Sequence, residues 1–192
     1  DVDSLSQKDI LPIIEMSIPA LKRLSAQQYS EFKHHLTQFI FADKNSDLQE
    51  WLQFRLLSHY LDQHFNVGTK KRFTRSYHSF PQIKDSLICV MSLLANAAHD
   101  SDELKDAAYS KGMQSLNIND TSRITVENLE FINVNKSIEK IDYLVPLLKD
   151  DFLTACANCI EQDNSITPTE WGLLRVIAAC IGCPMPIVNR PD

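Results

Sequence analysis

The chain has 192 residues, of which 44% are hydrophobic, so it can bury a substantial core and is not expected to be disordered. Its four glycines are too few for a protein rich in tight β-turns, and its net charge of −6 disfavours non-specific binding to nucleic acid. The longest apolar run, residues 87–98, is about half as long as a bilayer-spanning helix, so we expect no membrane-spanning segment.

Helical spacing of apolar residues dominates the first part of the chain. It predicts a helix over residues 4–15, with Pro19 ending or following it. Ser25 has the position of an N-cap before a second helix, and Trp51 lies in a third helix that follows the polar loop 43–47. A basic stretch then follows, formed by Lys70, Lys71, Arg72 and Arg75. Such a stretch is typical of a solvated loop, and contact with anionic lipid head groups is the alternative.

The second part of the chain is also predicted to be helical. Pro81 opens a strongly apolar helix that reaches about His99, and a helix from about Asp102 is expected to end near Gly112, a plausible C-cap. Shorter helical pieces are expected from about residues 125 and 136, and a final pair over 146–162 and 167–181. No segment alternates polar and apolar residues as a strand does. We therefore predict an all-α domain over residues 1–192, with about eight or nine helices and no sheet.

The sequence matches itself at a shift of 120 residues, so that residues 24–61 correspond to residues 144–181. The only two tryptophans, Trp51 and Trp171, occupy equivalent positions, and each directly follows a glutamate. The residues of the first copy that are identical in the second are Leu24, Phe32, Ile40, Asp43, Glu50, Trp51 and Arg55. We therefore predict two quasi-repeated acidic helix–loop–helix units.

Each acidic loop carries a helix-start pattern. Thr167 is a predicted N-cap, with Pro168 at the first helical position and Glu170 at the third, which together form a capping box. Asp47 and Glu50 repeat this spacing in the first copy, with the aspartate as the cap. Helix capping therefore explains these acidic residues without any ligand.

The duplicated Asp-x-x-x-Thr/Asp-x-x-Glu loop between amphipathic helices resembles the TerB-like helical domains associated with tellurite resistance. The tail, residues 163–186, is similar to the C-terminal domain of bacterial integral-membrane zinc metallopeptidases, the HtpX-like proteases with chaperone function. Residues 21–51 also fit that group, so the resemblance covers nearly the whole chain. It implies a TerB-like helical bundle.

The resemblance also implies that this chain is a piece of a longer membrane protein, at the cytoplasmic face of the bacterial inner membrane and soluble by itself. Peptidases of that group bind zinc through a His-Glu-x-x-His motif, which none of the six histidines here forms. The zinc and the catalytic residues would then belong to a domain that precedes this chain. The expected partner is that protease domain or another protein, and the expected role is substrate recruitment or regulation without catalysis.

A divalent cation held by the acidic loops is the alternative function. An EF-hand is excluded because Leu48 and Pro168 stand where its glycine is required. Carboxylates still favour Ca²⁺ or Mg²⁺, and metal binding has been proposed for TerB-like domains. The candidate metal ligands are Asp43, Asp47 and Glu50 in the first loop, and Asp163 and Glu170 in the second.

Two further groups have metal-ligand chemistry. Cys156-x-x-Cys159 and Cys180-x-x-Cys183 have the spacing of a four-cysteine zinc site, but the repeat places most of these cysteines at inward helix positions. They are therefore predicted to be small buried residues. A third acidic patch is formed by His99, Asp100, Asp102 and Glu103, where Asp100 or Asp102 is predicted to cap the next helix.

Overall fold

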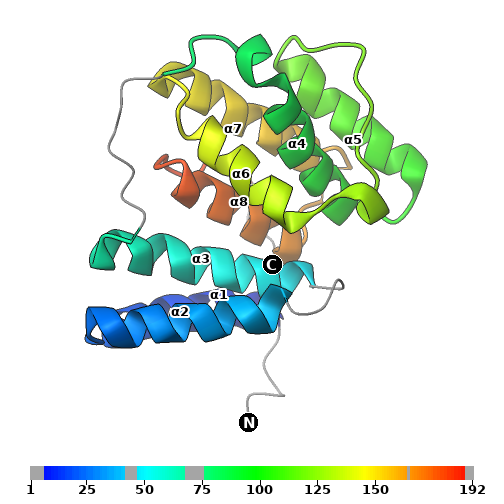
Figure 1. Cartoon of the computed structure of the whole chain (residues 1–192). Helices are drawn as coiled ribbons and strands as arrows, with labels where there is room; N and C mark the ends of the chain where they lie inside the picture. The colour runs from blue at the N-terminus through cyan, green and yellow to red at the C-terminus, as the bar shows by residue number, and fades with distance from the viewer. Residues whose placement is uncertain (1–6, 42–46, 68–75, 164, 189–192) are drawn as a thin grey trace. The chain divides into compact units, whose positions relative to one another are not determined.

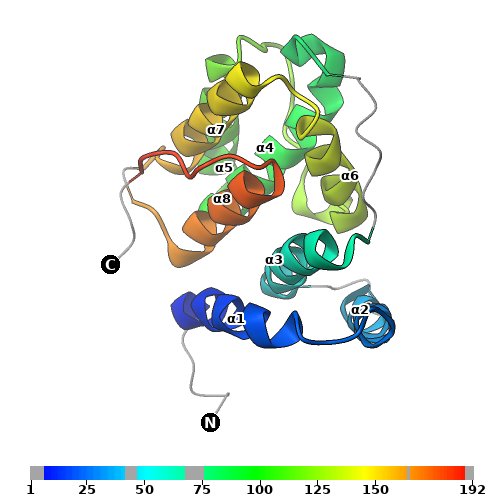
Figure 2. The same cartoon turned by 90° about the vertical axis from the view of Figure 1, so that its left-hand side faces the viewer.

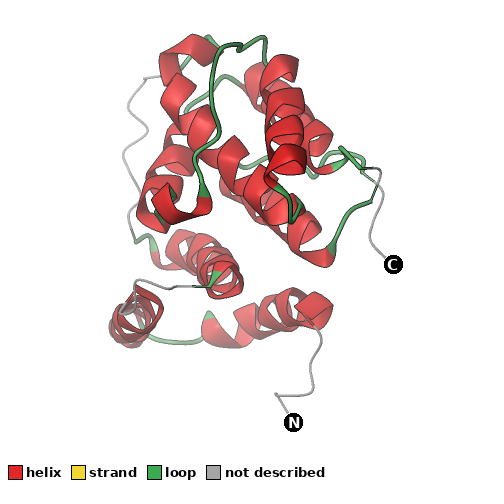
Figure 3. Ribbon diagram, turned by 90° about the vertical axis from the view of Figure 1, so that its right-hand side faces the viewer, coloured by secondary structure: helices red, strands yellow, loops and turns green. Residues whose placement is uncertain are grey.

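The computed structural model describes residues 7–41, 47–67, 76–163 and 165–188. Over these ranges it contains eight α-helices, two short 3₁₀ turns and no β-strand (Figure 3). Two backbone segments meet in an isolated parallel bridge between Tyr77 and Leu144. The all-α prediction is therefore confirmed for the part of the chain that the structure describes.

The chain divides into two compact units, residues 1–73 and residues 74–192. One copy of the sequence repeat lies in each unit, and each unit is described here by itself. The prediction that residues 1–192 make a single domain stays a prediction.

The described part of the first unit contains three helices, and the third contacts both of the others. Figures 1 and 2 both show α3 above α1 and α2. The helices are α1 (Gln7–Leu21), α2 (Ala26–Phe41) and α3 (Leu48–Phe65). Ile18, Tyr29 and Leu61 form a buried cluster, with one residue from each helix, and this cluster holds the three helices together.

The helix α1 runs six residues beyond its predicted end at residue 15. Pro12 and Pro19 both lie inside it, so the prediction that Pro19 ends or follows the helix was wrong. The helical hydrogen bonding continues past Pro19, where the Lys22 amide donates to the Ile18 carbonyl at 2.9 Å. Burial of Ile18 against α2 and α3 outweighs the single hydrogen bond that a proline removes.

A polar contact fastens α2 to α3. Lys33 Nζ lies 2.6 Å from Asp62 Oδ2, and the Tyr29 hydroxyl donates to Asp62 Oδ1 at 2.7 Å. Burial raises the pKa of Tyr29, and the hydrogen bond and charge of Asp62 raise it further. Tyr29 therefore stays protonated and remains a donor.

Among its described residues the second unit contains five helices, and α4 lies at their centre, in contact with each of the other four. Leu87, Val90 and Leu94 of α4 are fully buried, as expected for its continuous apolar sequence. The helices are α4 (Lys84–Ala98), α5 (Asp102–Ser115), α6 (Phe131–Ile141), α7 (Pro146–Ile160) and α8 (Pro168–Cys180). The 3₁₀ turns are Phe80–Ile83 and Val126–Asn128.

Gly112 does not end α5, contrary to the prediction from sequence. It lies inside the helix, which continues to Ser115. A Cβ atom at Gly112 would lie 2.5 Å from Met91 Sδ and 3.1 Å from Cys159 Cβ. The glycine is therefore explained by the close approach of α5 to α4 and α7, and not by a positive φ.

The helix boundaries of the two units recur at a separation of 120 residues. Helices α1 and α6 end 120 residues apart, and the starts of α2 and α7 and of α3 and α8 are separated by the same interval. The turn after the first helix of each set has the same backbone hydrogen bonds. These are Lys22 to Ile18, Arg23 to Ala20 and Leu24 to Leu21 in one unit, and Asp142 to Ile138, Tyr143 to Lys140 and Leu144 to Ile141 in the other.

No helix in the described ranges is both long and apolar enough to span a bilayer.

Candidate functional site

The start of α8 confirms the predicted capping box. Thr167 Oγ1 accepts a hydrogen bond from the Glu170 amide at 3.2 Å, and Glu170 Oε2 accepts one from the Thr167 amide at 2.6 Å. Pro168 occupies the first helical position, where its missing N–H has no consequence. The carboxylate of Glu170 is thus held in place by the first turn of its own helix.

Glu170 is unusually buried for the glutamate of a capping box, since the residue is only 1% exposed. Its second oxygen, Oε1, is buried and has no hydrogen-bond partner. Burial raises the pKa of Glu170, the hydrogen bonds with Thr167 oppose this shift, and the charge of Asp163 adds to it. Glu170 therefore holds a proton more readily than an ordinary glutamate does.

His99 lies close to the same loop. It is the C-cap residue of α4, and its side chain is 3% exposed. The ring nitrogen Nδ1 lies 3.6 Å from Asp163 Oδ2, whereas Nε2 is buried without a hydrogen-bond partner. Asp163 Oδ1 accepts a hydrogen bond from the Ser165 amide at 2.9 Å. Asp163 thus lies beside His99 and acts electrostatically on Glu170, and we call these three residues the His99 cluster.

Cys159 of α7 lies close enough to Glu170 for the two groups to interact electrostatically. Burial raises the pKa of Cys159 to about 12, and the charge of Glu170 contributes to the rise while that of Lys111 opposes it. The pKa of Cys156 is raised well above its ordinary value, also chiefly by burial. Both thiols are therefore protonated near neutral pH, which makes them poor nucleophiles.

The remaining cysteines lie in α4, at the end of α8 and in the segment that follows it, and Cys89 of α4 is buried. Cys180 and Cys183 are half-buried, and all five cysteines of the chain are free. The prediction of buried residues is confirmed for Cys156 and Cys159, which are 0% exposed.

The predicted metal ligands of the first loop are only partly described. Asp43 lies outside the described residues. Asp47 is confirmed as the N-cap of α3, where its side chain accepts from the Gln49 amide at 3.4 Å, and Glu50 lies half-buried in the first turn.

The second loop brings Asp163 beside His99, and sequence reasoning did not group the histidine with Asp163 or Glu170. The described residues nevertheless contain no group of three or more histidine, cysteine, aspartate or glutamate side chains arranged to hold a metal ion. The five candidate ligands therefore stay a prediction.

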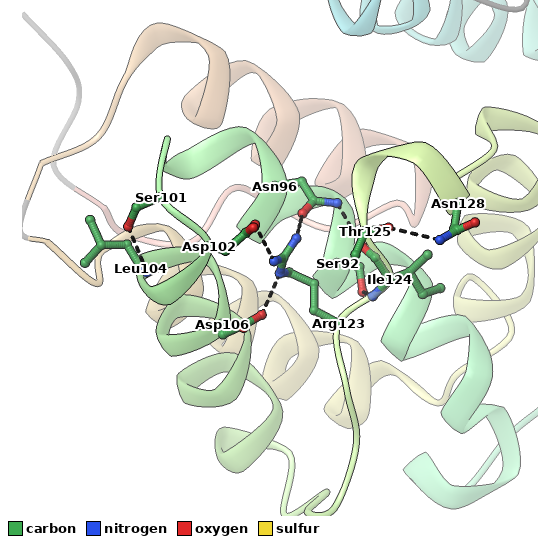
Figure 4. A network of polar contacts seen from close by, with 10 residues as sticks. All are labelled: Ser92, Asn96, Ser101, Asp102, Leu104, Asp106, Arg123, Ile124, Thr125 and Asn128. Carbon is green, nitrogen blue, oxygen red and sulfur yellow. Dashed lines mark hydrogen bonds and ion pairs between the residues drawn. The ribbon is translucent and has the colours of Figure 1, made fainter.

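A second polar network centres on Arg123, a residue that sequence reasoning did not single out (Figure 4). Its side chain is 4% exposed, with Nε 2.8 Å from Asp106 Oδ1 and Nη2 2.9 Å from Asp102 Oδ1, and Nη1 donates to Asn96 Oδ1. Because these partners lie on α4 and α5, Arg123 ties the segment between α5 and α6 to both helices. A single arginine in a polar segment gives no sequence signal for this role.

The same region corrects the predicted cap of α5. Ser101 is the N-cap, and its Oγ accepts from the Leu104 amide at 3.3 Å (Figure 4). The predicted cap was Asp100 or Asp102, and Asp102 instead pairs with Arg123. A serine and an aspartate cap a helix about equally well, so local sequence could not decide between neighbouring positions.

The asparagine and serine of α4 extend this network. Asn96 Nδ2 donates to the Ile124 carbonyl at 3.0 Å, and Ser92 Oγ accepts from the Ile124 amide at 2.9 Å. Both backbone groups of Ile124 are therefore paired with side chains of the central helix. The network has a structural role, since it joins Arg123 and the backbone of Ile124 to the side chains of α4 and α5.

No protein-family model matches the sequence, and no curated protein or solved structure is detectably similar to the chain.

Proposed function

We propose that this chain is a non-catalytic accessory domain of a membrane-bound zinc metalloprotease, and that it acts by protein–protein contact in substrate recruitment or regulation. The supporting observation is the set of large apolar side chains that the described helices leave in solvent. Met16 of α1 is 80% exposed, Phe39 of α2 is 75% exposed and Leu147 of α7 is 73% exposed. Contiguous patches of exposed apolar residues mark surfaces that bind other proteins, and the proposal requires some of these side chains to belong to such a patch.

The proposal includes a TerB-like fold made of two quasi-repeated units. Its support is the recurrence of helix boundaries at 120 residues, together with the N-caps Asp47 and Thr167 at equivalent positions. The resemblance of the tail to HtpX-like peptidases supports the choice of parent protein, which would carry the zinc and the catalytic residues.

Deletion of this chain from the parent protease tests the proposal. We expect the parent lacking residues 1–192 to cleave a short peptide at the normal rate and to cleave a folded protein substrate several-fold more slowly. Equal rates on both substrates would contradict a role in recruitment or regulation. A variant of the parent that carries Met16→Asp and Leu147→Asp serves as a milder version of the deletion.

The second candidate function is a metal-responsive module, and one observation favours it. Two polar atoms of the His99 cluster, His99 Nε2 and Glu170 Oε1, are buried without hydrogen-bond partners. Such atoms are costly to leave unpaired, and a bound cation would satisfy both types of group.

Thermal unfolding tests this second candidate. The midpoint of the purified chain is measured in chelator and then with Ca²⁺, Mg²⁺ or Zn²⁺ in excess, because an ion that binds only the folded state must raise stability. We expect a rise with one ion that is lost in Glu170→Gln if the second loop binds it, or in Glu50→Gln if the first loop does. Identical midpoints under all conditions would exclude the metal-responsive function.

A further inference from the structure

We draw no further inference here: the strongest candidate, the uncovered side of α2 that carries Phe32, His35, Leu36 and Phe39, is an unpartnered helix face, and nothing in the structure shows what covers it.

Discussion

Thr167 and Glu170 begin α8 with two reciprocal hydrogen bonds, so the cap can be tested one residue at a time. Thr167→Ala removes the side-chain acceptor and should lower the free energy of unfolding by about 1 kcal/mol. Urea denaturation measures this loss. Thr154→Ala, at an exposed position inside α7, is the control and should have little effect or stabilise slightly, because alanine favours helix. An equal loss in both variants would contradict the role of the cap.

Glu170 should also make stability depend on pH. Its pKa is raised in the folded chain, mainly by burial, so the folded state binds the proton more tightly than the unfolded state does. The resulting stability is fully present below the pKa of the unfolded state and is lost as the pH rises through the higher pKa of the folded state. Between about pH 4 and pH 7, the free energy of unfolding should therefore fall less in Glu170→Gln than in the unmodified chain.

Urea denaturation at several pH values measures this difference. The matched control is Glu103→Gln, which changes an exposed glutamate of α5 and should leave the pH dependence unchanged. If the unfolding free energy of the unmodified chain and that of Glu170→Gln had the same pH dependence, burial of the Glu170 carboxylate would not be the cause of the loss of stability with rising pH.

Removal of the Arg123 side chain should lower the free energy of unfolding more than removal of the charge of either carboxylate partner. Its own side chain is 4% exposed, whereas those of Asp102 and Asp106 are 78% and 63% exposed. Arg123→Ala removes charged hydrogen bonds and buried packing, and should cost about 2 kcal/mol of unfolding free energy. Asp102→Asn removes one solvent-exposed pair and should cost less than about 1 kcal/mol. Equal costs by urea denaturation would contradict the assignment of Arg123 as the centre of the network.

At the scale of whole helices, most starts were predictable because capping is a local property. Ser25, Asp47 and Thr167 each lie at the N-cap position that the sequence indicated. Helix ends were less predictable. Pro19 and Gly112 are common near the ends of helices, yet both lie inside helices here. Packing of α1 and α5 against their neighbours decides those positions, and a single helix sequence does not contain that information.

Gly112 gives a direct test of helix packing. Alanine at this position would raise the helix propensity of α5 by about 1 kcal/mol. Its Cβ would, however, lie within 2.5 Å of the buried Met91 sulfur and 3.1 Å from Cys159 Cβ. Overpacking of this kind costs typically 1–3 kcal/mol, so we expect Gly112→Ala to be destabilising overall.

Thermal unfolding by circular dichroism measures the effect. Ser110→Ala, at an exposed position of the same helix, is the control and should stabilise slightly. A higher midpoint for Gly112→Ala would mean that α5 does not need the close approach to α4 and α7.

At the scale of the molecule, the two tryptophans report on the two units separately. Trp51 lies in the first unit and Trp171 in the second. The variant Trp171→Phe leaves only the reporter of the first unit, and Trp51→Phe leaves only that of the second. Most of the buried apolar residues belong to the second unit, so we expect fluorescence to show that the first unit unfolds at a lower urea concentration. Coincident transitions would instead indicate one cooperative domain.

The candidate site was predictable in its parts but not as a group. Asp163 and Glu170 belong to one loop, so their proximity follows from the sequence. His99 is more than sixty residues earlier in the chain, at the end of α4, and its position beside Asp163 depends on how α4 packs against α7 and α8. For the same reason, the partners of Arg123 on α4 and α5 have no signature in the sequence.

The sequence by itself determined the helical class, the order of the helices and most of their starts. These depend on interactions within a few residues: apolar spacing, caps and the scarcity of glycine. Only the tertiary structure decided which polar groups are buried without partners, which glycine allows close packing, and which side of α2 remains uncovered. Those properties depend on atoms from helices far apart in the chain, and the repeat illustrates the difference. Phe39 and Cys159 occupy equivalent positions in sequence, but neighbouring helices cover only the second.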